Sequence, residues 1–479
     1  MQLIDLLAAV TARGLLDVPP VVDGDPATVV RRATHDSAVV GPGDLFCCVP
    51  GARHDGHDFA AGAVAAGASA LLVERPLHLG VAEVRVASVR RAMGPVAAAL
   101  EGFPAEHLDV IGVTGTNGKT TTTHLLAAIL REAGVRCGVI GTLTGARTTP
   151  EAPLLQGELG AMRDDGCTAV AMEVSSHALD QHRVDGVRFR VAAFTNLSQD
   201  HLDYHGTMDA YFEAKARLFE PSRCELAVVD VDDPWGRRLA DALDVPVVAC
   251  SLADASGLEV TATGSRFGWR GEPVELALPG RFNVANALVA ASIAEALGIG
   301  PVPVAAGLSG AGVVAGRFER IDEGQPFLAA VDYAHTPDGL RRLLEAAREL
   351  TTGRVVLVFG AGGDRDRDKR PAMGEAAAEL ADVVVLTTDN PRGEDPAAIM
   401  AAVRRGMDGS AEVIEVPDRG HAISTGVAAA RAGDVLLVAG KGHETTQTVG
   451  ERTLPFDDRL VLREALLARR TTDDPEPSS

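Results

Sequence analysis

Several features that would assign a protein to a particular class are missing from this sequence of 479 residues. No apolar run approaches the ~20 residues that a membrane-spanning helix requires. The N-terminal stretch MQLIDLLAAV carries Asp5 and no basic region ahead of its apolar residues, so we expect no secretory signal. The sequence also has no CxxC pair among its six cysteines, which predicts small buried side chains in a reducing compartment. Together these absences predict a cytoplasmic protein.

Positive charge is also scarce. Lys and Arg number 45 against 66 Asp and Glu, and the formal net charge is −21, which disfavours a nucleic-acid or anionic-membrane partner. An anionic substrate would therefore need locally concentrated basic residues. The length predicts two to four domains, and 46% hydrophobic with 23% charged residues is a globular balance. Residues 471–479, TTDDPEPSS, have the composition of a disordered end.

The stretch from Val110 to Gly134, VIGVTGTNGKTTTTHLLAAILREAG, predicts a buried strand, a phosphate loop and a helix. Its first residues are apolar, as in a parallel sheet, and leucines and isoleucines then recur at helical spacing. Between them, TGTNGKT turns the chain so that backbone N–H groups face a phosphate. Lys119 would add a positive charge and Thr120 a hydroxyl for Mg²⁺. An ordinary glycine-rich turn is the alternative, but Lys and Thr directly after the second Gly favour nucleotide binding.

The loop departs from the general P-loop pattern, because position 113, five residues before Gly118, is Val and not Gly. The string TGTNGKTTT instead resembles the ATP loop of the Mur ligases and of their folylpolyglutamate synthase relatives, which use ATP to activate a carboxylate for amide formation. The resemblance implies ATP contacts along this loop and at three later positions. They are Gly115, Thr116, Asn117, Gly118, Lys119, Thr120, Thr121, Asn283, Arg317 and Asp332. For Asn283, capping of the helix that it precedes is an equally good interpretation.

A second informative stretch lies at residues 169–219. Ala169–Val174 is predicted to be a strand carrying Glu173 at its carboxyl end, where a carboxylate could hold Mg²⁺ opposite the phosphates. Val191–Thr195 is predicted as another strand, and the polar residues after it suggest a second metal position. A helix-capping acid is the alternative for Glu173, weakened by the apolar residues before it.

The resemblance to the Mur ligases adds roles that spacing and composition would not reveal. It implies that Lys215, in an EAK segment, is carbamylated and that the metal ligands are Thr120, Glu173, His201 and Lys215. Lys119, Lys215 and His201 would then be the catalytic residues. Without the resemblance, Lys215 would be interpreted as a lysine on a solvated helix face.

Residues 1–108 alternate short apolar strands with Ala-rich helical segments, which predicts a small α/β domain with strands at Leu45–Val49 and Ala70–Val73 and a helix at Phe59–Gly67. Its THDS string resembles the segment with which these ligases hold the uridine-diphosphate end of UDP-MurNAc-L-Ala-D-Glu. The resemblance implies substrate contacts from His35, Ser37, Ala52, Arg53, His54, Thr148, Thr149, Ser175, Gln181 and Arg183. Arg147 stands where the family pattern has Asn. For His35 and His54, surface or capping histidines are the alternative.

The third part of the chain should contain the site that selects the incoming amino acid. Val355–Phe359, Val383–Thr387 and Val435–Ala439 are predicted strands, and each precedes a polar string: GAGGDRDRDKRP, TDNPRGEDP or GKGHETTQ. Because carboxyl ends of parallel strands meet at one sheet edge, we expect the strings to converge. Arginines suit carboxylates and acidic side chains suit ammonium groups, so the ligand should be a zwitterion with extra charge at its far end.

Diaminopimelate has these groups, and the family resemblance links DNPR to it. The implied contacts are Arg365, Asp389, Asn390, Pro391, Arg392, Gly440 and Glu444. The meso isomer is expected, with the LL isomer left open because both carry the same groups. A charged surface turn would explain DNPR alone, but it explains three matched loops poorly.

The fold class expected from the resemblance is α/β, with the three-domain Mur ligase architecture. A central P-loop ATPase domain (109–315) would be flanked by two smaller α/β domains, a UDP-MurNAc-binding one (1–108) and a Rossmann-like amino-acid-binding one (316–470). The implied function is ATP-dependent, Mg²⁺-dependent addition of diaminopimelate to UDP-MurNAc-L-Ala-D-Glu, through an acyl phosphate, in peptidoglycan precursor synthesis. A monomer is expected, because the sequence has no long heptad pattern or exposed apolar stripe. Three alternatives stay open: an L-lysine-adding ligase, a folylpolyglutamate synthase-like ligase, and a non-catalytic nucleotide-binding scaffold.

Overall fold

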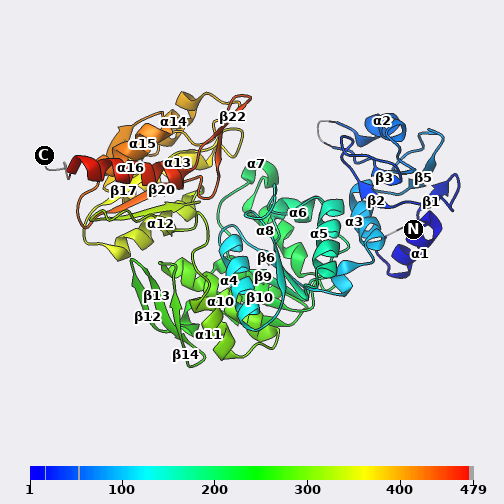
Figure 1. Ribbon diagram of the computed structural model, residues 1–479, viewed down its shortest axis with the longest axis horizontal. Coiled ribbons are helices and arrows are strands. Elements are labelled where there is room, and N and C mark those ends of the chain that lie inside the picture. Colours follow the sequence, from blue (N-terminus) through cyan, green and yellow to red (C-terminus); the bar gives the residue numbers. More distant parts are fainter. Residues whose placement is uncertain (17, 52–53, 474–479) are drawn as a thin grey trace, which may run out of the picture.

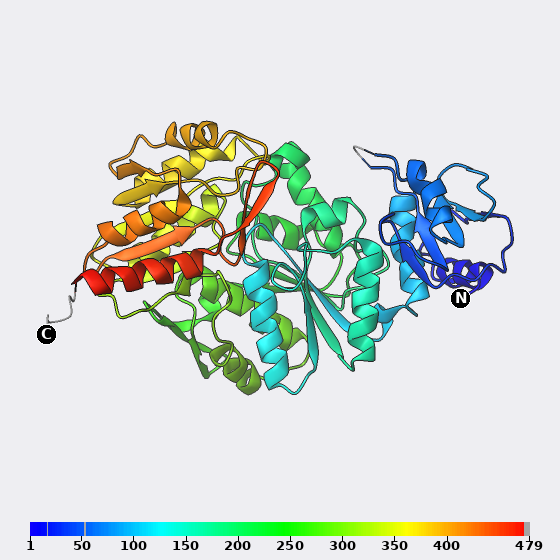
Figure 2. The same ribbon diagram turned by 45° about the horizontal axis from the view of Figure 1, so that its top comes forward.

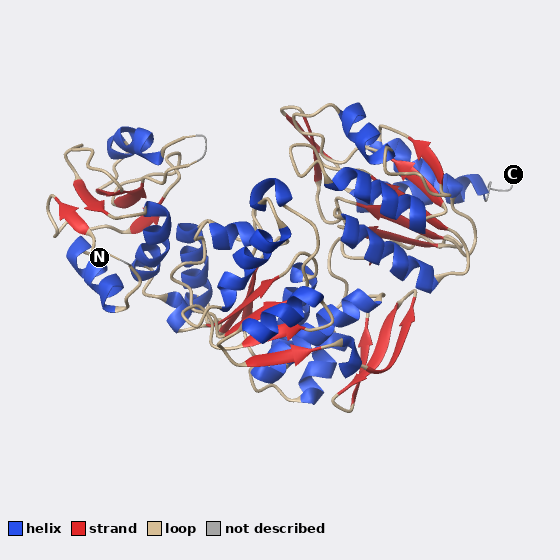
Figure 3. Ribbon diagram, turned by 180° about the vertical axis from the view of Figure 1, so that it is seen from behind, coloured by secondary structure: helices blue, strands red, loops and turns tan. Residues whose placement is uncertain are grey.

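A computed structural model describes residues 1–16, 18–51 and 54–473. The chain forms three α/β domains that follow one another in sequence and in space, with the two termini at opposite ends of the molecule (Figures 1 and 3). Across these described ranges, no helix is long and apolar enough to cross a membrane.

The first domain contains a five-stranded sheet in the order β1-β5-β4-β3-β2, in which only the pairing of β1 with β5 is antiparallel. The predicted strand–helix–strand unit is confirmed as β3, α2 and β4, although α2 is shorter than predicted and follows the short 3₁₀ helix η1 (Gly56–Phe59). The strands are β1 (Val21–Asp23), β2 (Arg32–Thr34), β3 (Asp44–Cys47), β4 (Ala70–Val73) and β5 (Ala82–Arg85); the helices are α1 (Leu3–Ala12), α2 (Ala60–Ala65) and α3 (Val89–Leu100).

The middle domain is built on a parallel sheet of six strands in the order β11-β10-β9-β6-β8-β7. The predicted phosphate-loop strand is β6, near the middle of the sheet, and the strand carrying Glu173 is its neighbour β8. The strands are β6 (Asp109–Thr114), β7 (Cys137–Ile140), β8 (Ala169–Glu173), β9 (Val191–Phe194), β10 (Ala227–Asp230) and β11 (Val247–Cys250). The helices and 3₁₀ turns are α4 (Lys119–Glu132), α5 (Ala152–Asp164), α6 (Ser176–Asp180), α7 (Leu202–His205), α8 (Met208–Ala216), η3 (Arg217–Phe219), α9 (Pro234–Ala242), η4 (Leu252–Asp254), α10 (Arg281–Ala296) and α11 (Pro301–Ser309). The short 3₁₀ turn η2 (Pro104–Glu106) leads from the first domain into β6.

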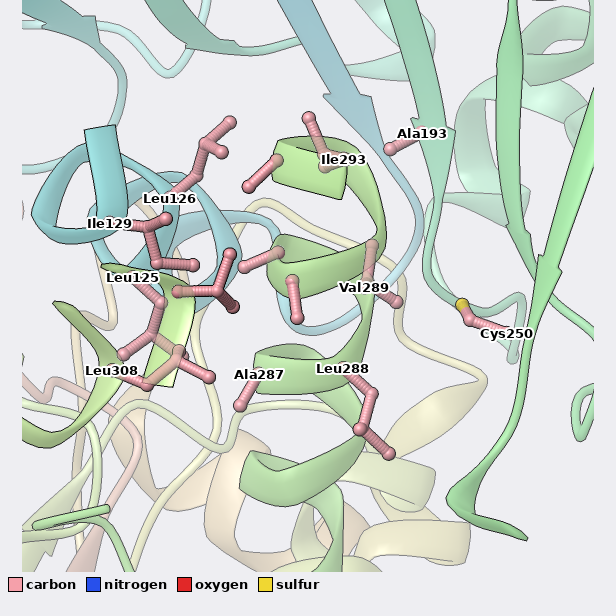
Figure 4. Packing of buried hydrophobic residues seen from close by; sticks show 14 of the residues in the cluster. Leu125, Leu126, Ile129, Ala193, Cys250, Ala287, Leu288, Val289, Ile293 and Leu308 are labelled. Carbon is pink, nitrogen blue, oxygen red and sulfur yellow. The ribbon is translucent and has the colours of Figure 1, made fainter. Parts of the chain in front are cut away.

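Packing around α4 fixes the position of the phosphate loop. Leu125, Leu126 and Ile129 of α4 are fully buried in a cluster with residues of α10 and α11 such as Ile293 and Leu308 (Figure 4). These apolar residues recur every three or four positions, so one face of α4 is buried. An antiparallel sheet of β12 (Ser256–Thr261), β13 (Gly264–Trp269) and β14 (Glu272–Leu276), absent from the sequence prediction, packs on the same cluster.

The third domain has a sheet in the order β15-β16-β20-β17-β18-β19, parallel except for the short β15. The three predicted strands are confirmed as the central strands β17, β18 and β20. The strands are β15 (Glu319–Arg320), β16 (Leu328–Asp332), β17 (Val355–Phe359), β18 (Val383–Leu386), β19 (Glu412–Glu415), β20 (Val435–Ala439), β21 (Thr446–Val449) and β22 (Arg452–Pro455). The helices are α12 (Pro337–Leu350), α13 (Lys369–Leu380), α14 (Pro396–Arg404), α15 (Arg419–Ala429) and α16 (Asp458–Asp473).

Two expectations from the sequence need correction. The predicted disordered tail overlaps α16, which continues to Asp473, while residues 474–479 lie outside the described ranges. The six cysteines are all free, as expected, but only Cys47, Cys48, Cys224 and Cys250 are buried. Cys137 and Cys167 are half-buried because they lie at β7, an edge strand, and just before β8.

Candidate active site

A cavity of about 410 Å³ lies between the middle and third domains. The middle domain contributes the phosphate loop and the carboxyl ends of β8 and β9, and the third domain contributes the loops after β16, β17, β18 and β20. Residues predicted for nucleotide, metal and amino acid therefore share one cavity, which is lined by Thr116, Asn117, Gly118, Lys119, Thr120, Thr121, Glu173, Asp200, His201, Asn283, Arg317, Asp332, Arg365, Lys369, Asp389, Asn390, Arg392, Gly440 and Glu444, among others.

The phosphate loop depends on two glycines with positive φ. Gly115 has φ 148° and Gly118 has φ 88°, conformations that side chains rarely adopt. A Cβ on Gly115 would lie 2.0 Å from Thr195 Oγ1, and one on Gly118 would lie 2.2 Å from Asn286 Oδ1. The loop is also held to β9, since Asn117 N donates to Asn196 Oδ1 at 3.0 Å. Its glycines are thus required both by backbone conformation and by close neighbours.

Lys119 is folded back over the phosphate loop. Its Nζ donates to the carbonyl oxygens of Gly115 and Thr116, at 2.9 Å each. Burial lowers the pKa of Lys119, and the nearby Glu173 carboxylate opposes that shift. The ammonium group therefore lies where the loop backbone turns, the position expected for a phosphate ligand.

Glu173, at the end of β8, is buried and accepts several hydrogen bonds. Its Oε2 accepts from Thr120 Oγ1 at 3.0 Å, and its Oε1 accepts from Thr142 N at 2.8 Å. Arg317, from the boundary of the third domain, donates to the same Thr120 hydroxyl at 2.9 Å. A hydroxyl and a carboxylate this close are hard oxygen donors of the kind that Mg²⁺ prefers.

The described ranges contain no cluster of three or more His, Cys, Asp and Glu side chains placed to hold a metal ion. A cation at this edge would therefore need donors of other kinds, such as the Thr120 hydroxyl and the phosphates of a nucleotide. The predicted metal ligands, Thr120, Glu173, His201 and Lys215, include such donors, and their role remains a prediction.

Lys215 is buried on α8, 1% exposed, and is not on a solvated helix face. Its Nζ donates to Gly115 O at 2.8 Å and lies 4.5 Å from the ring centre of Tyr211. Burial lowers the pKa of Lys215 well below its usual value, and the neighbouring Lys119 lowers it further. A neutral amine is the form that reacts with CO₂, so the environment suits the expected carbamylation.

His201 and Asp200 follow β9 at the same edge. His201 has φ 56° and its Nε2 lies 3.3 Å from Asp200 Oδ2. Burial lowers the pKa of His201 to about 3, so the imidazole is neutral at neutral pH and has a nitrogen lone pair available. A neutral imidazole is the form that a metal ligand requires.

Predicted nucleotide residues outside the loop also line the cavity. Asn283, at the start of α10, donates from Nδ2 to Pro279 O, while its buried Oδ1 has no partner. Asp332, at the end of β16, accepts from the backbone of Phe318 and Ala334, both at 2.7 Å. Asn283 therefore has an unused acceptor, which supports contact with a ligand, whereas Asp332 also holds local backbone in place.

The three polar loops of the third domain do converge. Asn390 Nδ2 donates to Glu444 Oε2 at 2.8 Å, and Arg392 Nη1 donates to Gly363 O at 2.7 Å. These contacts join the loops after β17, β18 and β20. Arg365 and Asp389 line the same cavity, while Pro391 lies beside its wall and is not among the lining residues described.

The β21–β22 hairpin supports the DNPR loop, a contact that the sequence analysis missed. Arg392, which has φ 50°, donates from its backbone N to Thr448 O and accepts at its O from Gly450 N. Gln447 Nε2 donates to Asp389 O at 2.6 Å. The hairpin lies on the side of the third domain that faces the middle domain (Figures 1 and 2).

The predicted substrate residues of the middle domain surround Glu151. Arg183 donates to Thr149 O and Gln181 Oε1, and Glu151 pairs with both Arg183 and Arg147. Arg147, in the place of the expected Asn, is thus engaged in an ion pair. Thr148 and Ser175 line the cavity, and Thr149 Oγ1 accepts from Ser175 N.

Of the predicted residues of the first domain, the three that the structure describes, His35, Ser37 and His54, are not among those lining the cavity. His35 is half-buried near Glu151, and burial lowers its pKa. Ser37 and His54 are exposed, with the His54 ring 6.2 Å from that of Phe59. Ala52 and Arg53 lie outside the described residues. A ligand that touched both His35 and the cavity would have to extend across the junction of the first two domains, where Arg90 of α3 pairs with Glu151 at 2.9 Å.

Lys369, Asp366 and Asp230 line the cavity but were not predicted. Lys369 lies in GAGGDRDRDKRP, the first of the three polar strings, so its position gave a weak signal. Asp230 ends β10, and burial raises its pKa to about 6. An acidic residue at the carboxyl end of a parallel strand was the available signal for Asp230.

Three family models match consecutive parts of the chain. The Mur ligase family catalytic domain matches residues 30–110, the Mur ligase middle domain residues 113–294, and the Mur ligase glutamate ligase domain residues 316–442.

Individual proteins match over nearly the whole chain. UDP-N-acetylmuramoyl-L-alanyl-D-glutamate–2,6-diaminopimelate ligase from Streptomyces coelicolor is 45% identical and covers 96% of this chain and 97% of its own length. The protein of that name from Gloeobacter violaceus is 46% identical and covers 98% and 99%. A solved structure of a ligase with that name superposes with a TM-score of 0.67 at 33% identity, covering 98% of this chain and 99% of its own.

Proposed function

The chain belongs to the Mur ligase family, and on that premise we propose that its cavity is where diaminopimelate is joined to UDP-MurNAc-L-Ala-D-Glu. The protein is an ATP-dependent acid–amino-acid ligase of peptidoglycan precursor synthesis. One observation supports this assignment above the others: a single cavity is lined by a phosphate loop on one side and by the DNPR loop and its two neighbours on the other. A scaffold without catalysis would have no need for that juxtaposition.

The first half of the reaction takes place at the phosphate loop. The D-Glu side-chain carboxylate attacks the γ-phosphorus of ATP, forming an acyl phosphate and releasing ADP. Negative charge gathers on the phosphoryl oxygens, and Lys119, the loop N–H groups and Arg317 are placed to stabilise it. In the second half, the diaminopimelate amine attacks the acyl carbon and phosphate leaves. These steps need no covalent nucleophile from the protein, so positioning dominates.

Mg²⁺ fits the donors at this edge. Thr120 and Glu173 would hold one ion, and His201 with carbamylated Lys215 would support a second. When bound, the ions supply positive charge that offsets the phosphate charge. The protein's own contribution is to fix those donors, because Glu173 is anchored by Thr142 and Lys215 is enclosed beneath the loop.

Binding of the amino acid is assigned to the third domain. Arg365 and Arg392 are suited to the carboxylates of diaminopimelate, and Asp389 and Glu444 to its ammonium groups. Arg392 is fixed at both ends, by its backbone pairing with β21 and by its guanidinium contact with Gly363. Diaminopimelate has a second carboxylate at the far end of its chain, and lysine has none there. A fixed guanidinium can recognise that second carboxylate, so the diaminopimelate ligase is favoured over the L-lysine-adding alternative. The meso isomer is our proposal.

The nucleotide-linked substrate would extend from the cavity to the first domain. Thr148 and Ser175 would contact its dipeptide, with Thr149, Gln181 and Arg183 behind them. His35, Ser37, Ala52, Arg53 and His54 would hold its uridine-diphosphate end. The substrate would cross the junction between the first and middle domains, where Arg90 of α3 pairs with Glu151.

Domain limits at residues 108/109 and 315/316 agree with the positions of the three sheets and remain a proposal. We also propose that the protein acts as a monomer. Its substrates, ATP and a UDP-linked precursor, favour a cytoplasmic location.

The assignment of Arg392 is tested by competition. The protein is given ATP, Mg²⁺, UDP-MurNAc-L-Ala-D-Glu and equal amounts of meso-diaminopimelate and L-lysine, and the product is identified by mass. The intact protein should form the diaminopimelate product, and Arg392→Ala should lose at least about tenfold in kcat/KM for diaminopimelate while its KM for ATP changes little. Thr453→Ala, on the exposed strand β22, is the control and should behave like the intact protein. An unchanged preference in Arg392→Ala would remove this residue from the amino-acid site.

A further inference from the structure

The basic residues of this chain are divided very unevenly between lysine and arginine. Only four of the 45 are lysines: Lys119, Lys215, Lys369 and Lys441. All four lie on or beside the cavity. Lys119 and Lys369 line it, Lys215 contacts Gly115 beneath the phosphate loop, and Lys441 contacts Asn390 and Glu444 in its wall.

This distribution indicates that lysine occupies positions where the size and shape of an arginine side chain would not be suitable. An ammonium group is a compact point charge, whereas a guanidinium is a larger planar fork. Two of the four already have a reason to be lysine in the proposed function: Lys119 as a phosphate ligand and Lys215 as the amine that becomes a carbamate. Lys441 pairs at 3.0 Å with Glu444, three residues away in its own domain. The proposed function gives neither Lys441 nor Lys369 a role, but of these two lysines it is Lys369 that contacts another domain.

Lys369 forms an ion pair between domains. It is the first residue of α13 in the third domain, and its Nζ lies 3.1 Å from Oδ1 of Asp200 in the middle domain. The two side chains are only 8% and 5% exposed. While the two domains are in contact, each of these charges is held away from water beside its partner. Removal of one partner would leave the other charge buried and unpaired, and would therefore disfavour contact between the domains.

Asp200 in turn contacts a predicted metal ligand. The same Oδ1 accepts from the backbone N of His201 at 3.0 Å, and Oδ2 lies 3.3 Å from His201 Nε2. His335 of the third domain lies 3.9 Å from Oδ2. The orientation of the Asp200 carboxylate, and with it that of the His201 ring, is therefore set partly by groups that arrive with the third domain.

We propose that Lys369 is a positioning residue that couples contact between the third and middle domains to the geometry of the phosphoryl-transfer edge, by holding Asp200 and through it His201. The coupling to catalysis rests on the proposed function. The contact between the two domains does not depend on the proposed function, and it can be measured without any reaction.

The first test measures domain arrangement in the ligand-free protein by small-angle X-ray scattering. Lys369→Met and Asp200→Asn should each increase the radius of gyration, and the double variant should increase it no further, because both single changes break one contact. Arg367→Met is the matched control: this residue is two positions away, its side chain is 70% exposed, and it pairs with Glu394 inside its own domain. Scattering of Lys369→Met that matches the intact protein and Arg367→Met would overturn the proposal.

The second test measures catalysis. Lys369→Met should lower kcat for phosphate release about 100-fold, because a small misplacement of the reacting groups slows the chemical step by that order. The KM for ATP should change little. Lys369→Arg should fail to recover it, since the larger fork does not fit between α13 and Asp200. Trapping of the acyl phosphate with hydroxylamine, without amino acid, should fall in parallel. Full activity of Lys369→Arg, or a loss that only follows a lower melting temperature, would contradict the role. Absence of phosphate release in the intact protein would instead contradict the proposed function and leave the scattering result to decide the closure.

Discussion

At the scale of single residues, the least expected assignment is that of Lys215. Its amine is buried under the phosphate loop, and burial lowers its pKa well below the usual value. Only the neutral amine adds CO₂, so a carbamate should form near neutral pH and form more slowly as the pH falls below the lowered pKa.

We expect removal of bicarbonate at mildly acidic pH to lower kcat at least about tenfold and its return to restore the rate, because the carbamate would be lost and remade. Lys215→Ala should have a low rate that bicarbonate does not change. Activity that is indifferent to bicarbonate, together with a fully active Lys215→Ala, would show that the lysine is not modified.

Asp230, at the end of β10, gives a stability prediction with a defined sign. Burial raises its pKa to about 6, so the folded chain binds this proton more tightly than the unfolded chain. The carboxyl group therefore lowers the free energy of unfolding as the pH rises from about 4 to 6, and the loss is complete above that.

Asp230→Asn keeps the oxygen that accepts from Asp232 N. It should raise the free energy of unfolding by up to about 3 kcal/mol at pH 8, since the pKa is raised from 3.8 to about 6 and each pKa unit corresponds to about 1.4 kcal/mol. The advantage should shrink between pH 6 and 4, as measured by urea unfolding. An advantage that is the same at pH 4 and pH 8 would show that Asp230 is not the group responsible.

Residues that lie in contiguous strings could be predicted from the sequence, and residues defined by distant partners could not. Lys119, Thr120 and Glu173 stand in strand, loop and helix patterns that have a direct chemical meaning. Lys369 is meaningful only beside Asp200, which is 169 positions earlier, and nothing local indicates that pairing. Arg317 reaches Thr120 over 197 positions, and only the family resemblance suggested its role.

At the scale of elements, the parallel strands that the sequence analysis named, such as β8, β17 and β20, were predicted to within about two residues, because their runs of buried Val, Leu and Ala have few alternatives. Other parallel strands, among them β7, β10 and β16, were not predicted. The antiparallel sheet β12–β14 and the hairpin β21–β22 were missed. Their strands are partly or wholly exposed, so their hydrophobic pattern is weak, and in β22 every residue is exposed. That hairpin nevertheless holds the backbone of Arg392, which shows that a weakly patterned element can position a site.

Helix α4 offers a test of the phosphate loop with a control on the same element. Gly118 precedes the helix and Gly134 follows it, and both have positive φ, 88° and 77°. An added Cβ would collide with Asn286 at Gly118 and meet nothing within 4 Å at Gly134.

Either substitution by Ala should cost about 1 kcal/mol of stability through backbone strain. Gly118→Ala alone should also weaken ATP binding at least about tenfold, because the loop must shift away from Asn286. Calorimetric titration of the nucleotide measures this difference. Equal ATP affinity in the two variants would mean that the loop conformation seen here does not bind the phosphates.

At the scale of the whole molecule, three domains placed in series explain how two large substrates and one amino acid meet. In the proposed function, the middle domain would activate the carboxylate, the third would select the amine, and the first would hold the far end of the nucleotide. The architecture was predictable because the resemblance to the Mur ligases implies three domains and the sequence patterns of the three parts agree with it. The relation between the domains was not, since it depends on pairs such as Lys369–Asp200 and Arg90–Glu151, whose members lie in different domains.

In the proposed reaction, diaminopimelate is joined to an activated carboxylate within the cavity. The most direct measurement is phosphate release by the purified protein with ATP, Mg²⁺ and UDP-MurNAc-L-Ala-D-Glu, with meso-diaminopimelate, LL-diaminopimelate or L-lysine added in turn. We predict release with diaminopimelate, the meso isomer in particular, and none with lysine. Release with lysine alone, or with no amino acid at all, would contradict the account.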